Sequence, residues 1–132
     1  LESESLFPAV LVHGRTSDED YRAILSDCDV GLALKPVGGP LADTTFPSKV
    51  IEFANAGLLV VTTDISDAGL ILGDGARYLS SNEVDELLCT LKPIHFDRFA
   101  ARNCGIEGQR SVLEFCDPSV VGHELADFLL GK

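Results

Sequence analysis

The sequence contains no methionine, few basic residues and no long apolar run. Because translation starts at methionine, we expect the chain to be a piece of a longer protein. Only 10 Lys and Arg residues stand against 21 Asp and Glu residues, which gives a net charge of -11 at pH 7. This charge repels nucleic acids and anionic lipids, so we expect no nucleic-acid partner. No apolar run reaches the roughly 18 residues of a membrane helix, so we expect no transmembrane segment.

The cysteines lack the spacings that indicate metal or disulfide chemistry. None forms a C-x2-C pair, and none lies at a zinc-like distance from a histidine. Small disulfide-stabilised secreted domains are also shorter and poorer in aliphatic residues. We therefore expect reduced, buried thiols, a cytoplasmic protein, and no metal or other cofactor. The cysteines are Cys28, Cys89, Cys104 and Cys116.

The sequence does contain enough apolar residues, 45% of the chain, to form the core of one domain of 132 residues. Short apolar runs predict strands at 9–13, 30–34 and 58–62, and a weaker strand at 77–79. These strands alternate with helical patterns and are apolar on both sides. Such an order predicts an α/β fold, with a parallel sheet covered by helices on both faces.

Helix boundaries follow from local signals. Ser17 precedes three acidic residues and predicts a helix start. Pro47 suits the first position of a second helix, which Gly57 would end. The spacing 80–83 is that of a capping box and predicts a third helix, with the apolar residues Val84, Leu87, Leu88 and Leu91 on one face. About the last 35 residues are expected to be helical, with a break at 117–118.

The most informative stretch is 44–61, TTFPSKVIEFANAGLLVV, which follows a glycine-containing loop at 37–40. It predicts a loop, a helix start and then a strand. Ligands of open α/β sheets bind outside the carboxyl ends of the strands, where this loop would lie. The start of the following helix offers unpaired amides and a positive dipole end, which suit a pyrophosphate.

Lys49 and Glu52 are three residues apart and therefore share one face of the predicted helix. The lysine offers a cation for a phosphate, and the carboxylate can accept hydrogen bonds from the two hydroxyls of a ribose. The alternative is an exposed Lys–Glu pair that contributes less than about 0.5 kcal/mol to stability and has no ligand. Local spacing leaves both interpretations open.

The same stretch resembles the GT-B fold, "group 1" retaining glycosyltransferases, whose pattern here is loosely E-x-F-G/P-x-x-x-x-E-x-x-A-x-G-x-P-V-V. The matching residues are Phe46, Pro47, Ser48, Lys49, Glu52, Ala54 or Ala56, Gly57, Val60 and Val61. Weaker similarity extends over about residues 9–80. The resemblance implies a Rossmann-like sheet and a C-terminal, nucleotide-sugar-binding domain over residues 1–132. The first strands of that domain and the N-terminal acceptor domain would be missing.

The resemblance also implies roles for single residues. Glu52 corresponds to the second acid of the family's Glu-x7-Glu pair, which binds the nucleotide ribose. The amides around 46–49 correspond to the pyrophosphate-binding helix start. The first acid, which touches the donor sugar, is replaced by Thr44, with Asp43 off register by one residue. Gly14 and Arg15 lie where the family's loop approaches the base.

The function implied is transfer of a hexose from a nucleotide-sugar donor to a glycan or lipid-linked acceptor in polysaccharide synthesis. Such an enzyme would be cytoplasmic, or peripheral at the inner face of the membrane. We expect the present part to bind the donor but not to catalyse alone, because the family's basic pair lies in the missing strands. One alternative is a sugar-nucleotide 2-epimerase of the same fold. Another is a non-catalytic interaction domain, which Thr44 in place of glutamate favours.

Overall fold

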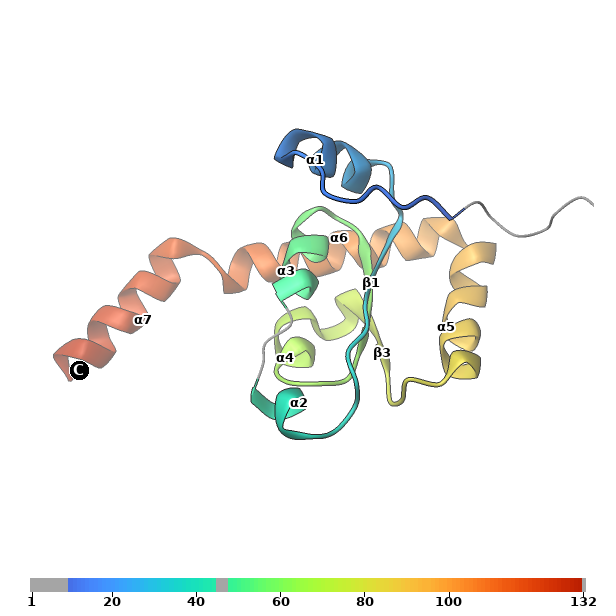
Figure 1. Cartoon of the computed structure of the whole chain (residues 1–132). Coiled ribbons are helices and arrows are strands. Elements are labelled where there is room, and N and C mark those ends of the chain that lie inside the picture. The colour runs from blue at the N-terminus through green and yellow to red at the C-terminus, as the bar shows by residue number, and fades with distance from the viewer. Residues whose placement is uncertain (1–9, 45–47, 132) are drawn as a thin grey trace, which may run out of the picture.

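The structure, a computed structural model, describes residues 10–44 and 48–131. Its centre is a three-stranded parallel sheet with the order β1-β2-β3 (Figure 1). The strands are β1 (Val30–Ala33), β2 (Leu59–Thr63) and β3 (Ala76–Leu79). An open parallel sheet with helices therefore confirms the predicted α/β class, and three of the four predicted strands are present.

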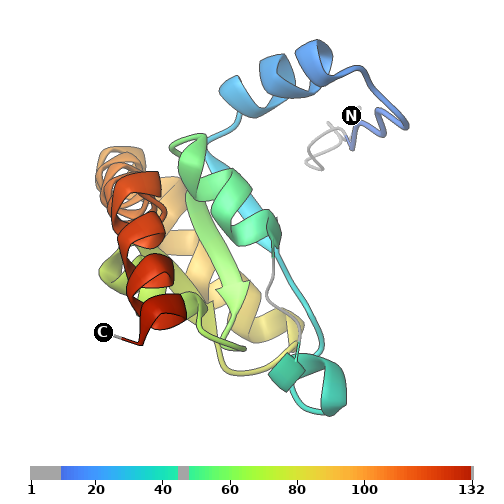
Figure 2. The same cartoon turned by 90° about the vertical axis from the view of Figure 1, so that its left-hand side faces the viewer.

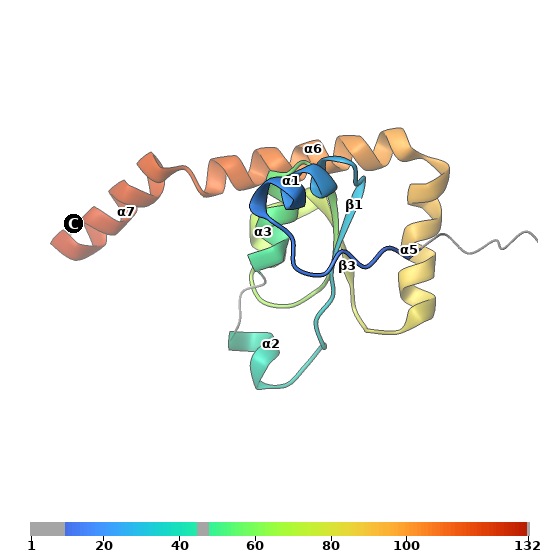
Figure 3. The ribbon, with the colours of Figure 1, turned by 45° about the horizontal axis from the view of Figure 1, so that its top comes forward.

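Helices surround this sheet on two faces and at one end (Figures 1 and 3). Helices α3 and α4 pack on one face, α5 lies on the other, and α6 crosses the end at which the strands begin. Helices α1 and α7 project from this body. The helices are α1 (Asp18–Ser26), α2 (Pro40–Thr44), α3 (Ser48–Asn55), α4 (Ala68–Leu72), α5 (Val84–Phe96), α6 (Arg98–Phe115) and α7 (Pro118–Leu130), with a 3-10 turn, η1 (Gly73–Gly75).

The central strand β2 is the core of the domain, because all five of its residues are buried. On one face, Val60 packs in a cluster with Val50 of α3 and Leu72 of α4. On the other face, Leu59 packs against Ala101 and Cys104 of α6. Burial on both faces explains why this strand is apolar without alternation.

Two glycines of α6 allow the helix to lie directly on the turns that lead into the sheet. A Cβ atom on Gly105 would lie 2.6 Å from the carbonyl oxygen of Gly57. A Cβ atom on Gly108 would lie 2.5 Å from the carbonyl oxygen of Gly75. Both contacts are too close for any side chain, so glycine at these positions sets the distance between α6 and the sheet.

Several predicted boundaries are confirmed. Ser17 is the N-cap of α1, and its hydroxyl accepts a hydrogen bond of 3.1 Å from the amide of Asp20. Gly57 follows α3 with a φ of 78°, a conformation that favours glycine at a helix end. The C-terminal helices break at Asp117, which caps α7 ahead of Pro118.

The strand predicted at 9–13 is absent over its described part. Val10, Leu11 and Val12 are 87%, 74% and 89% exposed and pair with no strand of the described residues. A strand needs a neighbour for its backbone hydrogen bonds, and this segment lies away from the sheet, beyond the N-terminal end of α1 (Figure 2). The apolar composition of the segment was therefore not sufficient to make it a strand.

The predicted capping box is also wrong. Glu83 is itself the N-cap residue of α5, and its side chain makes no capping hydrogen bond. Glu86 accepts instead, from the amides of Ser80 at 2.7 Å and Ser81 at 2.9 Å and from both hydroxyls. The α5 face expected to be apolar is only partly covered, because Val84 and Leu88 are exposed.

The expectation of buried cysteines holds for one residue alone. Cys104 of α6 is buried against Leu59 of β2, whereas Cys28, Cys89 and Cys116 are exposed. All four are free thiols. The exposed three lie after α1, in α5 and just after α6. Among the helices of residues 10–44 and 48–131, none is long and apolar enough to cross a membrane.

Candidate functional site

The unit β1–loop–α3–β2 positions the candidate site. Strands β1 and β2 are parallel, so the chain must return between them, and α3 forms this return. Val50 and Ala54 anchor one side of α3 in the core. The start of α3 lies toward the end of the sheet at which the strands finish (Figure 2), and its first residue, Ser48, is exposed. The start of α3 thus faces the end where α/β proteins bind ligands.

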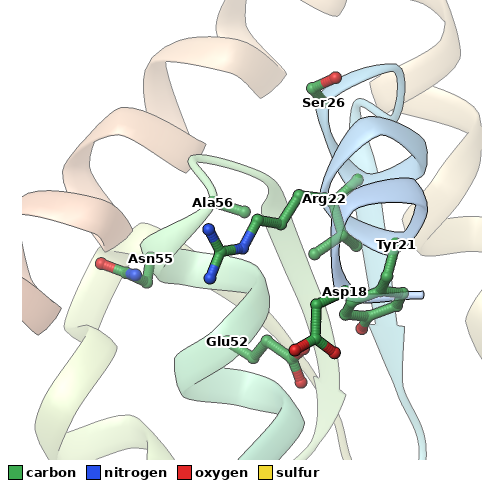
Figure 4. A pocket seen from close by; sticks show the side chains of 8 residues that line it. Asp18, Tyr21, Arg22, Ser26, Glu52, Asn55 and Ala56 are labelled. Atoms are coloured by element: carbon green, nitrogen blue, oxygen red, sulfur yellow. The ribbon is translucent and has the colours of Figure 1, made fainter.

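A hollow of about 570 Å³ lies between α1 and α3 (Figure 4). Asp18 and Arg22 reach into it from α1, and Glu52 and Asn55 line it from α3. The side chains of Asp18, Arg22 and Glu52 therefore lie near one another, although their helices are distant in sequence. The remaining lining residues are Tyr21, Leu25, Ser26 and Ala56.

Lys49 connects the two walls of this hollow. Its Nζ atom lies 2.6 Å from Glu52 Oε2, donates a hydrogen bond of 3.1 Å to Tyr21 Oη, and stands 4.9 Å from the centre of the Tyr21 ring. The hydrogen bond between Lys49 and Glu52 lowers the pKa of the Glu52 carboxyl below its ordinary value and raises the pKa of the Lys49 amine. Both side chains keep their charges at neutral pH, so Glu52 is an acceptor of hydrogen bonds only.

The Lys49–Glu52 pair is also accessible to water. The side chains are 56% and 37% exposed, and such pairs contribute little to stability. The structure thus places both residues on one helical face beside a hollow, as the spacing predicted. It shows equally the ordinary exposed ion pair that was the alternative.

A second hollow, of about 430 Å³, lies where β1 and β2 end. The loop after β1 forms most of its wall, including Gly38 and Gly39, both with a φ of 89°. The wall is mostly apolar and carries one charged residue, Lys35. The complete lining is Lys35, Pro36, Gly38, Gly39, Pro40, Ala42 and Ile65.

Side chains from the neighbouring strands fix the loop that forms this wall. The amide of Lys35 donates to the hydroxyl of Thr63 at 3.1 Å. Asn82, after β3, donates to the carbonyl oxygen of Lys35 at 2.9 Å and accepts from the amide of Val37 at 2.9 Å. Residues in β2 and after β3 therefore hold the loop that follows β1, and this loop shapes the second hollow.

The other predicted site residues are not gathered around Glu52. Thr44 ends α2, is exposed, and donates its hydroxyl hydrogen to the carbonyl oxygen of Pro40 at 2.6 Å. Gly14 and Arg15 precede α1, are exposed, and line neither hollow. Phe46 and Pro47 lie outside the described residues. Of the predicted set, Lys49 and Glu52 are brought together.

Several polar residues that line or support the two hollows were not anticipated. Asp18 was expected only as one of the three acids that favour a helix start after Ser17. Nothing in the local pattern marked Arg22, Asn55 or Asn82. Tyr21 bonds to Lys49 and Asn82 to Val37, which are 28 and 45 residues away, and no local spacing reveals such contacts.

Comparison of the chain with known protein families found no match, and comparisons with curated proteins and with solved structures found none either.

Proposed function

We propose that this chain binds a nucleotide-sugar donor, as the Rossmann-like C-terminal domain of a GT-B type glycosyltransferase. The observation that carries the proposal is the position of Glu52. In the sequence, this residue matches the family's ribose-binding acid, and in the structure it lines the hollow between α1 and α3.

In this proposal the donor lies along α3. The ribose hydroxyls donate to Glu52, whose carboxylate has about four lone-pair sites, of which Lys49 occupies one. The nucleobase extends into the hollow between α1 and α3. The diphosphate lies at the start of α3, where amides and the helix dipole favour an anion. The sugar points to the second hollow, beside Gly38 and Gly39.

The proposed reaction is hexosyl transfer to a glycan or lipid-linked acceptor, with retention of configuration as in the family that the sequence resembles. The donor domain would contribute by holding the leaving diphosphate in place and stabilising its developing charge. The acceptor would be bound by a second domain. Such an enzyme would work in the cytoplasm or at the inner face of the membrane.

A non-catalytic interaction domain is the second candidate, and two observations favour it. Thr44 stands where the family has its sugar-contacting acid, and its hydroxyl is already engaged with Pro40. Helix α7 also exposes large apolar side chains along its length, including Leu125 and Phe128. A surface of that kind is typical of protein contacts.

The test is a titration of the chain with nucleoside diphosphate sugars of different bases, followed by NMR shifts and calorimetry. We expect one base to perturb the amides of α3 and the residues of the first hollow. Glu52→Gln should weaken that binding by about 1.5–3 kcal/mol, the range for hydrogen bonds to a charged group. Glu19→Gln, which alters an acid of α1 outside the lining, is the control. Equal affinity in both variants, or no binding of any donor, would refute the proposal.

A further inference from the structure

Asp18 and Glu52 carry carboxylates into the same hollow from two different helices. Asp18 is the first residue of α1, Glu52 lies within α3, and their side chains lie near one another in the hollow (Figure 4). In the part of the chain that the structure describes, no hydrogen bond or ion pair engages the Asp18 side chain. Two neighbouring carboxylates repel each other, so this pair favours a ligand that places hydrogen-bond donors or positive charge between them.

The contact between Lys49 and Tyr21 lies next to both carboxylates. Tyr21 follows Asp18 by three residues, and Lys49 precedes Glu52 by three, so each shares a helical face with one of the two acids. Lys49 Nζ donates to Tyr21 Oη at 3.1 Å and lies 4.9 Å from the centre of the ring. This single contact between α1 and α3 therefore keeps Asp18 beside Glu52.

The cations in the hollow decide which ligand suits the two carboxylates. Lys49 already binds Glu52 Oε2 at 2.6 Å, and the guanidinium of Arg22 reaches into the same space. These positive charges repel a metal ion. A hydroxyl group is better suited, because its O–H donates to a carboxylate without adding charge. The pair thus favours a ligand that offers two neighbouring hydroxyls, one to each acid.

We propose that Asp18 is a second ribose ligand of the donor site, which accepts a hydrogen bond from one ribose hydroxyl while Glu52 accepts from the other. This inference rests on the proposed function and deepens it, because one of the two hydroxyls assigned there to Glu52 passes to Asp18. A site built to bond a hydroxyl rejects the analogue that lacks it. The chain should therefore select ribonucleotides over deoxyribonucleotides.

Calorimetric titration of the wild-type chain with ribonucleotides and their deoxy analogues is the first test. The probes are uridine, guanosine and adenosine diphosphates, so the result does not depend on which base the chain prefers. Each nucleotide is compared with its two deoxy analogues, which each lack one of the two ribose hydroxyls. We expect both analogues of the nucleotide that binds best to bind about tenfold or more weakly than their parent, the factor for a lost hydrogen bond to a charged group.

The variants Asp18→Ala and Glu52→Ala then assign each hydroxyl to its carboxylate. Each variant should bind the parent nucleotide about tenfold or more weakly than wild type does. Each should also become insensitive to the removal of one hydroxyl, and the two variants should differ in which hydroxyl that is. Glu19→Ala is the matched control, because it removes an acid from the same turn of α1 outside the lining, and it should behave like wild type.

Three results would overturn the role of Asp18. They are equal binding of the parent and both analogues by wild type, wild-type affinity in Asp18→Ala, and an equal loss for all three ligands in Asp18→Ala, which would indicate only a change in α1. The proposed function survives each of them if Glu52→Ala still weakens the parent nucleotide. Absence of binding by any of the nucleotides would overturn both proposals. The comparison of analogues on wild type requires no variant, so a variant that misfolds does not decide the outcome.

Discussion

The side chain of Asn82 holds the backbone of Val37, which lies 45 residues earlier, by accepting a hydrogen bond of 2.9 Å from its amide. The same side chain donates to the carbonyl oxygen of Lys35. One amide group therefore bridges the loops after β1 and β3 and closes the wall of the second hollow. The shape of that hollow depends on a residue that does not line it.

Asn82→Ala removes both hydrogen bonds of this bridge. Each exposed bond contributes on the order of 0.5–1.5 kcal/mol, so we expect the free energy of unfolding to fall by about 1 kcal/mol in urea denaturation. The Val37 amide should also exchange faster with solvent. Asn82→Asp keeps the acceptor and should preserve more of the Val37 protection than alanine does. Equal protection of Val37 in the wild type and Asn82→Ala would show that the bridge does not hold the loop.

The contact between α6 and the turn at Gly75 gives a second prediction. Gly108→Ala places a Cβ atom 2.5 Å from the Gly75 carbonyl oxygen, so the helix must move, and we expect a loss of about 1–3 kcal/mol of stability. Gly122→Ala is the matched control in α7, where nothing lies within 4 Å. There the higher helix propensity of alanine should stabilise the helix by up to about 1 kcal/mol. Thermal melts of the two variants shifting in the same direction would contradict this interpretation.

Features that depend on neighbouring residues were predictable from the sequence. The cap at Ser17 and the turn at Gly57 are set by local backbone chemistry, and both were found. The strands at β1 and β2 are short, apolar and bounded by turn residues, so their identity also followed. The helical face shared by Lys49 and Glu52 was fixed by their spacing.

Features that depend on a choice between partners were not predictable. The two serines before α5 have acids at 83, 85 and 86 within reach, and spacing favoured Glu83 over Glu86, which the fold selects. The segment 10–13 has the composition of a strand, but it pairs with no strand among residues 10–44 and 48–131. The link from Lys49 to Tyr21 requires α1 to lie over α3, which follows from tertiary packing alone.

Glu86 predicts how stability changes with pH. Hydrogen bonds from Ser81 and Ser80 lower the pKa of this carboxyl from 4.5 to about 2. A folded-state pKa below the unfolded value means that the charged group stabilises the fold above about pH 4.5, and that this contribution disappears as the pH falls to about 2. Wild type should therefore melt above Glu86→Gln at pH 6, and the difference should shrink steadily between pH 4.5 and pH 2. A difference independent of pH would indicate lost packing instead. Glu83→Gln serves as the control, because its side chain makes no capping hydrogen bond.

Lys49 of α3 contacts α1 through Tyr21, and we expect this contact to restrain α1. No residue of α1 is buried, and Lys49 of α3 donates a hydrogen bond to the Tyr21 hydroxyl of α1. Lys49→Met keeps most of the side-chain length but removes the charge and all the donated hydrogen bonds. We expect little change in the free energy of unfolding, less than about 1 kcal/mol, because the pair is exposed. Amide exchange in α1 should nevertheless become clearly faster, while exchange in β2 stays the same. Lys92→Met, a lysine of α5 outside the site, is the control. If α1 exchanges equally slowly in all three proteins, Lys49 does not tether the helix, and the hollow beside Glu52 must be held by other contacts.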